Sequence, residues 1–87
     1  IREIVAAHLP DLETALVDAA ISRFYGIRRM EGLRKKPSTS ELLDWLQVLA
    51  RAGADPKMIA KKVPFMGVLI KQDQDLEMLH SKHLGHA

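Results

Sequence analysis

Apolar side chains recur at steps of three and four along most of the chain, and this spacing predicts α-helices. We expect a first helix over residues 1–9, ended by Pro10. The longest periodic run covers residues 11–30, with Asp11 as the expected N-terminal cap. Its apolar positions are Leu12, Leu16, Ala19, Ala20, Phe24 and Ile27. Because so wide an apolar face requires neighbours on two sides, we expect this helix to be central.

Three further helices are predicted along the rest of the chain, with a short apolar run before the last of them. Residues 39–52 form a third helix whose buried stripe is expected to comprise Leu42, Trp45, Leu46 and Leu49. A short helix over residues 56–63 follows, with Asp55 as its cap and Pro56 in its first position. The run at residues 65–70 is compatible with a strand or a helical turn. A last helix begins near Asp73 or Asp75 and carries Leu76, Leu79 and His83.

The sequence therefore predicts an all-α fold, a small bundle of four to five helices joined by short connections. With 87 residues, the chain corresponds to a single domain. It has no cysteine, which excludes disulfides and thiolate metal sites and is compatible with the cytoplasmic location we expect. No apolar run approaches the length of a membrane span. The net charge of +2 permits an acidic partner without requiring nucleic acid. Since the sequence starts at Ile1, we expect it to be the C-terminal part of a longer protein.

The richest segment lies at residues 33–45 and reads LRKKPSTSELLDW. Pro37 disfavours a helix through the basic residues before it. Ser38 and Glu41 have the spacing of a capping box, in which each side chain accepts the backbone N–H of the other residue. The hydroxyl groups and free N–H groups of such a helix start, next to cations, suit an anion such as phosphate. The same residues also fit an ordinary helix cap, and the pattern alone does not choose between the two.

Most familiar catalytic motifs are missing from the chain. It has no G-x-x-x-x-G-K-[ST] loop, no G-x-S-x-G elbow and no thiol nucleophile. Asp73, Asp75 and Glu77 are expected to form a solvated acidic cluster at a helix start. The remaining chemistry lies in histidines: His8 is expected to be a partly buried packing residue. His80, His83 and His86 recur at steps of three, which is not the usual spacing of a helical zinc pair, and we expect no metal site.

A second basic strip is formed by Lys57, Lys61 and Lys62. It is interpreted either as a solvated face or as a docking surface for an acidic partner. Trp45 and the four methionines are interpreted as core residues rather than binding residues.

The segment KKPSTSELLDW resembles the lid-domain signature of a subgroup of MoxR-like AAA+ ATPases. Flanking segments are similar to patterns of the same subgroup and follow in the same order: HLPDL at 8–12, RFY at 23–25 and PFMGVLIKQDQDL at 64–76. This resemblance implies that residues 1–87 are a single helical lid domain, preceded in the parent protein by a nucleotide-binding α/β domain. The lid would close over ATP and magnesium bound to that domain, and the chain alone would be no enzyme.

The resemblance also implies partners. These are the AAA+ core domain of the same chain, the neighbouring subunits of a homo-oligomeric ring, and von Willebrand factor A domain proteins acting with a chaperone-like factor. Many AAA+ lids carry a phosphate-sensing arginine, called sensor 2, at the start of the third helix. No arginine stands there in this chain, so the nucleotide-facing candidates are Lys35, Lys36, Pro37, Ser38, Thr39 and Ser40. Lys35 or Lys36 could supply the charge, the hydroxyls and helix start could act without one, or the role could be lost; Lys36 is our first candidate.

Two other functions remain open from the sequence. A helix, a basic turn and a capped helix also outline a helix-turn-helix module that binds nucleic acid. Against that function, the second helix would present Glu41 and Asp44, which repel phosphates. The third possibility is a stand-alone protein-interaction bundle that docks a partner at an exposed apolar patch.

Overall fold

The computed structural model describes the backbone of residues 1–83, with the side chains of those residues other than Ala60 and residues 80–83. All regular secondary structure in the described part is helical, which confirms the predicted all-α bundle. Its six helices are α1 (Arg2–His8), α2 (Thr14–Arg28), α3 (Thr39–Arg51), α4 (Pro56–Lys61), α5 (Met66–Leu69) and α6 (Asp73–His83). The helix beyond the expected four or five is α5, a single turn in the run whose periodicity was ambiguous. In residues 1–83, no helix is long and apolar enough to cross a membrane.

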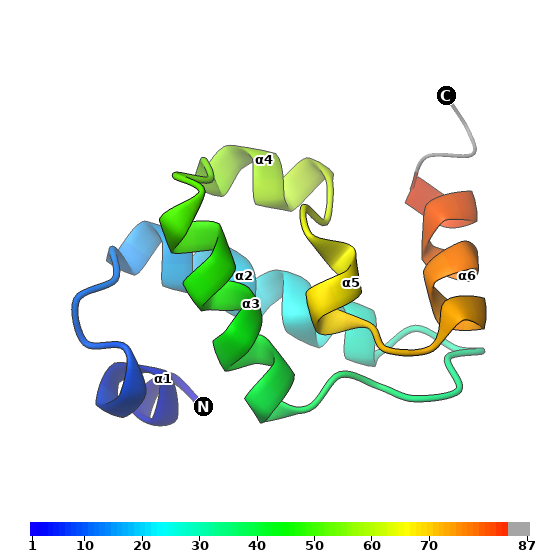
Figure 1. Cartoon of the computed structure of the whole chain (residues 1–87), viewed down its shortest axis with the longest axis horizontal. Helices are drawn as coiled ribbons and strands as arrows, with labels where there is room; N and C mark the ends of the chain where they lie inside the picture. The colour runs from blue at the N-terminus through cyan, green and yellow to red at the C-terminus, as the bar shows by residue number, and fades with distance from the viewer. Residues whose placement is uncertain (84–87) are drawn as a thin grey trace.

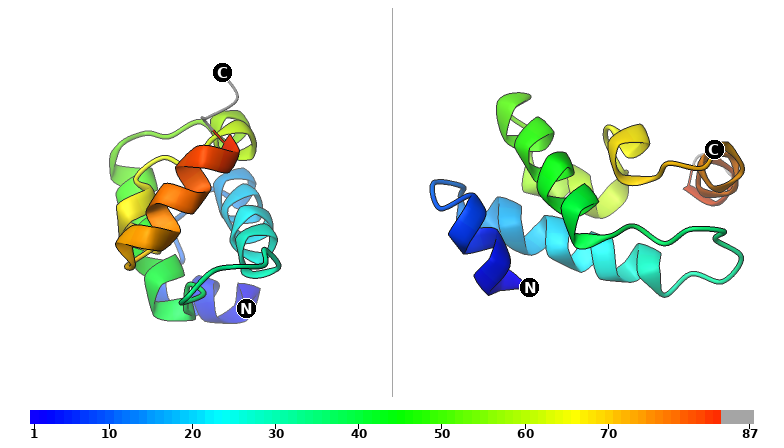
Figure 2. Two further views of the ribbon diagram at one scale, coloured as in Figure 1. Left: turned by 90° about the vertical axis from the view of Figure 1, so that its right-hand side faces the viewer. Right: turned by 60° about the horizontal axis from the view of Figure 1, so that its bottom comes forward.

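The long helix α2 is central, as its wide apolar face predicts. It packs against α1, α3 and α4, while α5 packs on α3. Figure 1 shows α2 behind α3, with α4 above them and α6 at the far right. In Figure 2, α6 lies at the opposite end of the molecule from α1, and the connection of residues 29–38 passes beside it.

One core joins the helices. The expected core residues Leu16, Phe24, Leu42, Trp45, Leu46 and Leu49 are all buried. Trp45 is completely buried, and its indole Nε1–H donates to the carbonyl oxygen of Pro64 at 2.6 Å. This bond ties α3 to the turn before α5 and satisfies the one polar group of a large apolar side chain. Truncation of such a tryptophan typically costs about 3–5 kcal/mol.

The ends of α2 differ from the prediction. The helix begins at Thr14 with Glu13 at the N-cap, so the expectation that Asp11 caps it was wrong. Residues 10–12 instead form a turn that brings α1 back against α2. The helix ends at Arg28, and Gly32 lies beyond it at a φ of +92°. At that position a Cβ atom would come within 3.2 Å of the Met78 sulfur, so Gly32 serves the turn rather than the helix end.

The end of α3 follows local rules closely. Gly53 adopts a φ of +67°, its N–H donates to the Ala50 carbonyl, and the Ala54 N–H donates to the Leu49 carbonyl. This pair of bonds is a Schellman motif, which satisfies carbonyls that a helix end leaves open. Asp55 then caps α4 by accepting the Lys57 N–H at 3.0 Å, and Pro56 takes the first helical position.

Four side chains are placed differently from the prediction. Met58 is 54% exposed, so the interpretation of all four methionines as core residues was wrong for this one. His8 is exposed, with its Nδ1 2.9 Å from the Ile4 carbonyl oxygen, so it is no packing residue. Asp75 is buried rather than solvated, and Glu41 is buried although its helix position faces water in the simple pattern. Of the histidine run, the side chains of His80 and His83 and all of His86 lie outside the described residues.

Candidate functional site

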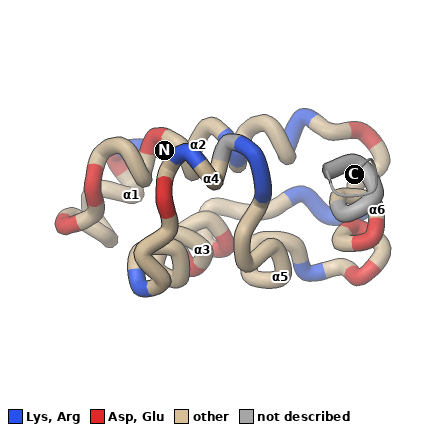
Figure 3. Tube along the Cα trace, turned by 90° about the horizontal axis from the view of Figure 1, so that it is seen from above, with Lys and Arg blue, Asp and Glu red and all other residues tan. Residues whose placement is uncertain are grey.

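The sequence-predicted site lies where the α2–α3 connection enters α3. We call it the basic junction and define it as residues 34–38 with Glu41 and Asp75. Figure 3 shows its basic segment between α3 and α6. The candidates Lys35, Lys36, Ser38 and Ser40 are exposed, Thr39 is half-buried and Pro37 is buried.

Ser38 and Glu41 form a complete capping box at the start of α3. The Ser38 N–H donates to Glu41 Oε1 at 2.8 Å, and the Glu41 N–H donates to Ser38 Oγ at 3.4 Å. The Ser38 hydroxyl also donates to Glu41 Oε1 at 3.1 Å. Two of these bonds hold the carboxylate over the helix start, where Glu41 is only 7% exposed.

The Glu41 carboxylate is electrostatically stabilised in this position. Burial alone raises its pKa, but the hydrogen bonds from Ser38 and the positive charges of Lys35 and Lys71 lower it by more. The net effect is a pKa below the ordinary value of a glutamate. The Lys35 Nζ lies 3.7 Å from Glu41 Oε2, so much of the charge of Lys35 is offset locally.

Asp75 fixes the backbone of the junction from α6. Its Oδ1 accepts the Arg34 N–H at 2.8 Å and its Oδ2 accepts the Lys35 N–H at 3.0 Å. The side chain is 1% exposed, so one buried carboxylate holds two successive N–H groups of the loop. These N–H groups are thus occupied by the protein itself and are closed to an external anion.

Arg28 completes the frame from α2. Its Nη1 donates to the Pro37 carbonyl oxygen at 2.6 Å, and its guanidinium lies 5.6 Å from the centre of the Phe24 ring. Arg28 therefore does more than complement the dipole at the end of α2. The junction is connected by its backbone to α2, α3 and α6.

Some of the groups predicted to bind an anion are not engaged by other residues of the described part. Among the described residues, the N–H groups of Thr39 and Ser40 make no hydrogen bond, and Lys36 forms no ion pair. Lys36, these two N–H groups and the Ser40 hydroxyl belong to one short stretch of chain. A hydrogen-bonding site for an anion is consistent with this arrangement. Among the residues whose side chains the structure describes, which leave out His80 and His83, no group of three or more acidic or histidine side chains could hold a metal ion.

Sequence reasoning missed the role of Asp75. The signal was present, because Asp75 and Leu79 lie four residues apart and therefore on one helix face. Leu79 is buried, and Asp75 shares its face. A carboxylate beside a core leucine indicates a buried acceptor, whereas Asp73 and Glu77, on the other faces, are exposed.

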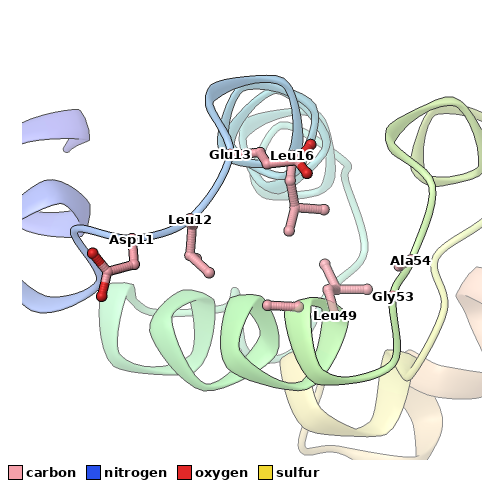
Figure 4. Close-up of a pocket in the computed structure, with 8 residues that line it drawn as sticks. Asp11, Leu12, Glu13, Leu16, Leu49, Gly53 and Ala54 are labelled. Carbon is pink, nitrogen blue, oxygen red and sulfur yellow. The ribbon is translucent and has the colours of Figure 1, made fainter.

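A separate pocket lies at the other end of α3. It has a volume of about 260 Å³, and its lining residues are Asp11, Leu12, Glu13, Leu16, Leu49, Ala50, Gly53 and Ala54. Figure 4 shows Leu12, Leu16 and Leu49 pointing into the space between the α1–α2 turn and α3. None of the junction residues lines this pocket, so the two features are independent.

Comparisons of the chain with protein-family models, curated proteins and solved structures found no match.

Proposed function

We propose that this chain is the helical lid of a MoxR-like AAA+ ATPase, with the basic junction facing the nucleotide. The proposal rests on the resemblance of the segments around residues 8–12, 23–25, 33–45 and 64–76 to that subgroup. The observation that carries it further is the junction itself. Exposed cations stand on a loop whose backbone is held by Asp75, Glu41 and Arg28. A rigid frame places charge in a defined direction, as recognition of a phosphate requires.

Within the junction, Lys36 is the cation we assign to the terminal phosphate of ATP. Both lysines are exposed, but Lys35 forms an ion pair with Glu41, whereas Lys36 has no ion-pair partner among the described residues. The Thr39 and Ser40 N–H groups would add hydrogen bonds to the phosphate oxygens. ATP and its magnesium would be bound mainly by the core domain, and the lid would close over them.

The mechanism we propose is mechanical. Nucleotide bound between core and lid would favour one lid angle, and that angle would set the contacts between ring subunits. The cytoplasmic location, the ring of identical subunits, the chaperone-like role and the von Willebrand factor A domain partners belong to the same proposal. The lid alone would not hydrolyse ATP.

The test uses the full-length product of the parent gene. The gene should encode a Walker A and Walker B domain before Ile1, and the protein should hydrolyse ATP. Lys36→Ala should weaken ATP affinity or slow turnover about tenfold, since it removes one charged contact to the phosphate. Lys57→Ala, a cation outside the junction, is the matched control. A parent without Walker motifs, or Lys36→Ala and Ser38→Ala variants with unchanged affinity and turnover, would refute the proposal.

A helix-turn-helix function is less favoured by the geometry. The connection between α2 and α3 spans residues 29–38, whereas the turn of that motif has about 3–4 residues. The exposed face of α3 includes Asp44, which would repel the phosphates of a duplex. A salt-sensitive shift of duplex DNA at micromolar protein would restore this function as a candidate.

A further inference from the structure

The short helix α4 presents a methionine to solvent among lysines. Met58 is 54% exposed, and Lys57, Lys61 and Lys62 are exposed around it. We call these four residues the α4 surface. A small open pocket of about 60 Å³ is lined by Met58, Lys61 and Lys62. In Figure 3, α4 faces the viewer with basic segments along it.

The exposure of Met58 does not come from a loosely held helix. Ile59, beside it in the sequence, is completely buried, and Val63 is 6% exposed. Asp55 caps the start of the helix, and the Trp45–Pro64 hydrogen bond holds the turn that follows it. The α4 surface is therefore presented by a fixed element, so a partner would not have to order it.

Within the described part of the chain, no ion pair balances the charge of the α4 surface, although the Asp55 carboxylate caps the start of the helix. No Asp or Glu occurs in residues 56–72. No ion pair involves Lys57, Lys61 or Lys62 among the residues that the structure describes. Lys57 and Lys61 lie one helical turn apart, where like charges repel. The fold thus retains an unfavourable concentration of positive charge around an exposed apolar side chain.

We propose that the α4 surface docks an acidic segment of a partner protein, with one apolar side chain of that segment placed against Met58. Carboxylates on either side of the apolar side chain would meet Lys57 at one end of α4 and Lys61 and Lys62 at the other. The small pocket suits the end of a single aliphatic side chain, and the lysine stems add apolar contact. This inference does not depend on the ATPase proposal.

Other anionic partners fit the surface less well. A membrane-surface helix needs a long apolar face, whereas α4 has six residues and Met58 as its exposed large apolar side chain. Nucleic acid phosphates would meet the lysines but would leave Met58 uncovered. An acidic peptide with an apolar residue satisfies both features at once.

The direct test is a titration of the chain, carrying ¹³C-methyl methionine, with a synthetic peptide. The peptide has one central leucine between runs of glutamate and aspartate, and a second peptide has serine in place of leucine. We expect the leucine peptide to shift the Met58 methyl resonance and to bind about fivefold more tightly than the serine peptide. Binding should weaken as salt is raised.

Variants of the chain separate docking from simple charge attraction. Met58→Ser should weaken binding of the leucine peptide about fivefold, and the double variant Lys61→Glu/Lys62→Glu should weaken it more than tenfold. Ile4→Ser on α1 and Lys36→Glu in the basic junction should leave it within about twofold. These controls remove an exposed apolar residue or reverse a charge elsewhere.

Several results would overturn the proposal. One is the absence of a Met58 shift at millimolar peptide, and another is equal binding of the leucine and serine peptides. A third is that duplex DNA or anionic lipid vesicles bind more tightly than the peptide and are indifferent to Met58→Ser. None of these results bears on ATP binding by the parent protein, so the two proposals fail separately.

Discussion

The chain carries two basic clusters of similar composition, and the structure surrounds them differently. In the basic junction, Asp75 and Glu41 accept backbone N–H groups, and Lys35 lies beside Glu41. On the α4 surface the lysines have no acidic partner among the described residues, and an exposed methionine lies between them. The comparison indicates that the junction's buried carboxylates serve the fold, whereas the lysines of α4 are dispensable to it. Substitutions in the two clusters should therefore change stability in opposite directions.

The largest effect is expected at Asp75. Asp75→Ala should lower the free energy of unfolding by about 2 kcal/mol, because two charge-assisted hydrogen bonds to the loop backbone are lost. Urea unfolding followed by far-ultraviolet circular dichroism measures this change. Asp73→Ala, an exposed residue on the same helix, should cost less than about 1 kcal/mol. Equal losses in the two variants would show that the buried carboxylate has no special role.

The next largest loss of stability is expected at Ser38. Ser38→Ala removes the side chain that caps α3 and should destabilise the chain by about 1 kcal/mol. Ser40→Ala is the matched control, since Ser40 lies in the same helical turn and is exposed; its effect should stay within about 0.5 kcal/mol. The same unfolding measurement applies. A larger loss at Ser40 than at Ser38 would contradict the capping geometry.

Glu41 should give the junction a pH-dependent stability. Its pKa is lower in the folded chain than in the unfolded chain, so its contribution is complete above the unfolded pKa, at about 4.5. That contribution is lost as the pH falls through the folded pKa. At pH 7, Glu41→Gln should cost roughly 0.5–1 kcal/mol, and the difference from the wild type should shrink in acid. A difference that is constant from pH 7 to acid would refute this charge effect.

On the α4 surface, replacing a lysine should raise the free energy of unfolding rather than lower it. Lys57→Glu replaces a cation in the first turn of α4 by an anion and turns a repulsion with Lys61 into an attraction. We expect a gain of about 0.5 kcal/mol in unfolding free energy at low salt. The gain should fade at about 1 M salt, where such charges are screened. A loss of stability at low salt would mean that Lys57 does contribute to the fold.

Much of the fold follows from local sequence signals. Helical spacing, the Ser38–Glu41 pair and Gly53 place the ends of α3 within one residue, and Asp55–Pro56 place the start of α4, because each of these signals acts within one turn of helix. The end of α4, predicted at residue 63, lies at Lys61. The start of α2 was predicted wrongly at Asp11. Residues 10–12 form a turn that brings α1 onto α2, and the local sequence does not show whether a polar residue there belongs to a turn or caps a helix. The helical conformation of the short run at residues 65–70 depends on its packing against α3, and the spacing of apolar residues carries no information about that contact.

The details of the site depended on long-range contacts. Asp75 lies 41 residues from Arg34 in sequence, and no local pattern joins them. The sequence therefore predicted the cations of the junction and the capping box but not the carboxylate that holds the loop. Lys36 was already the first candidate from the sequence, and the structure adds a physical difference between the two lysines, because Glu41 lies beside Lys35.

Because Trp45 is hydrogen-bonded to the Pro64 carbonyl, its fluorescence should report on the folding of the chain. Trp45 is the only tryptophan, and its indole is sealed from water against a turn from another part of the bundle. Its fluorescence should be blue-shifted in the native chain and shift to the red when α3 separates from that turn. Acrylamide should quench this fluorescence only when the bundle opens and exposes the indole ring. Every variant above can thus be followed, in equilibrium and in time, through light emitted by one native side chain.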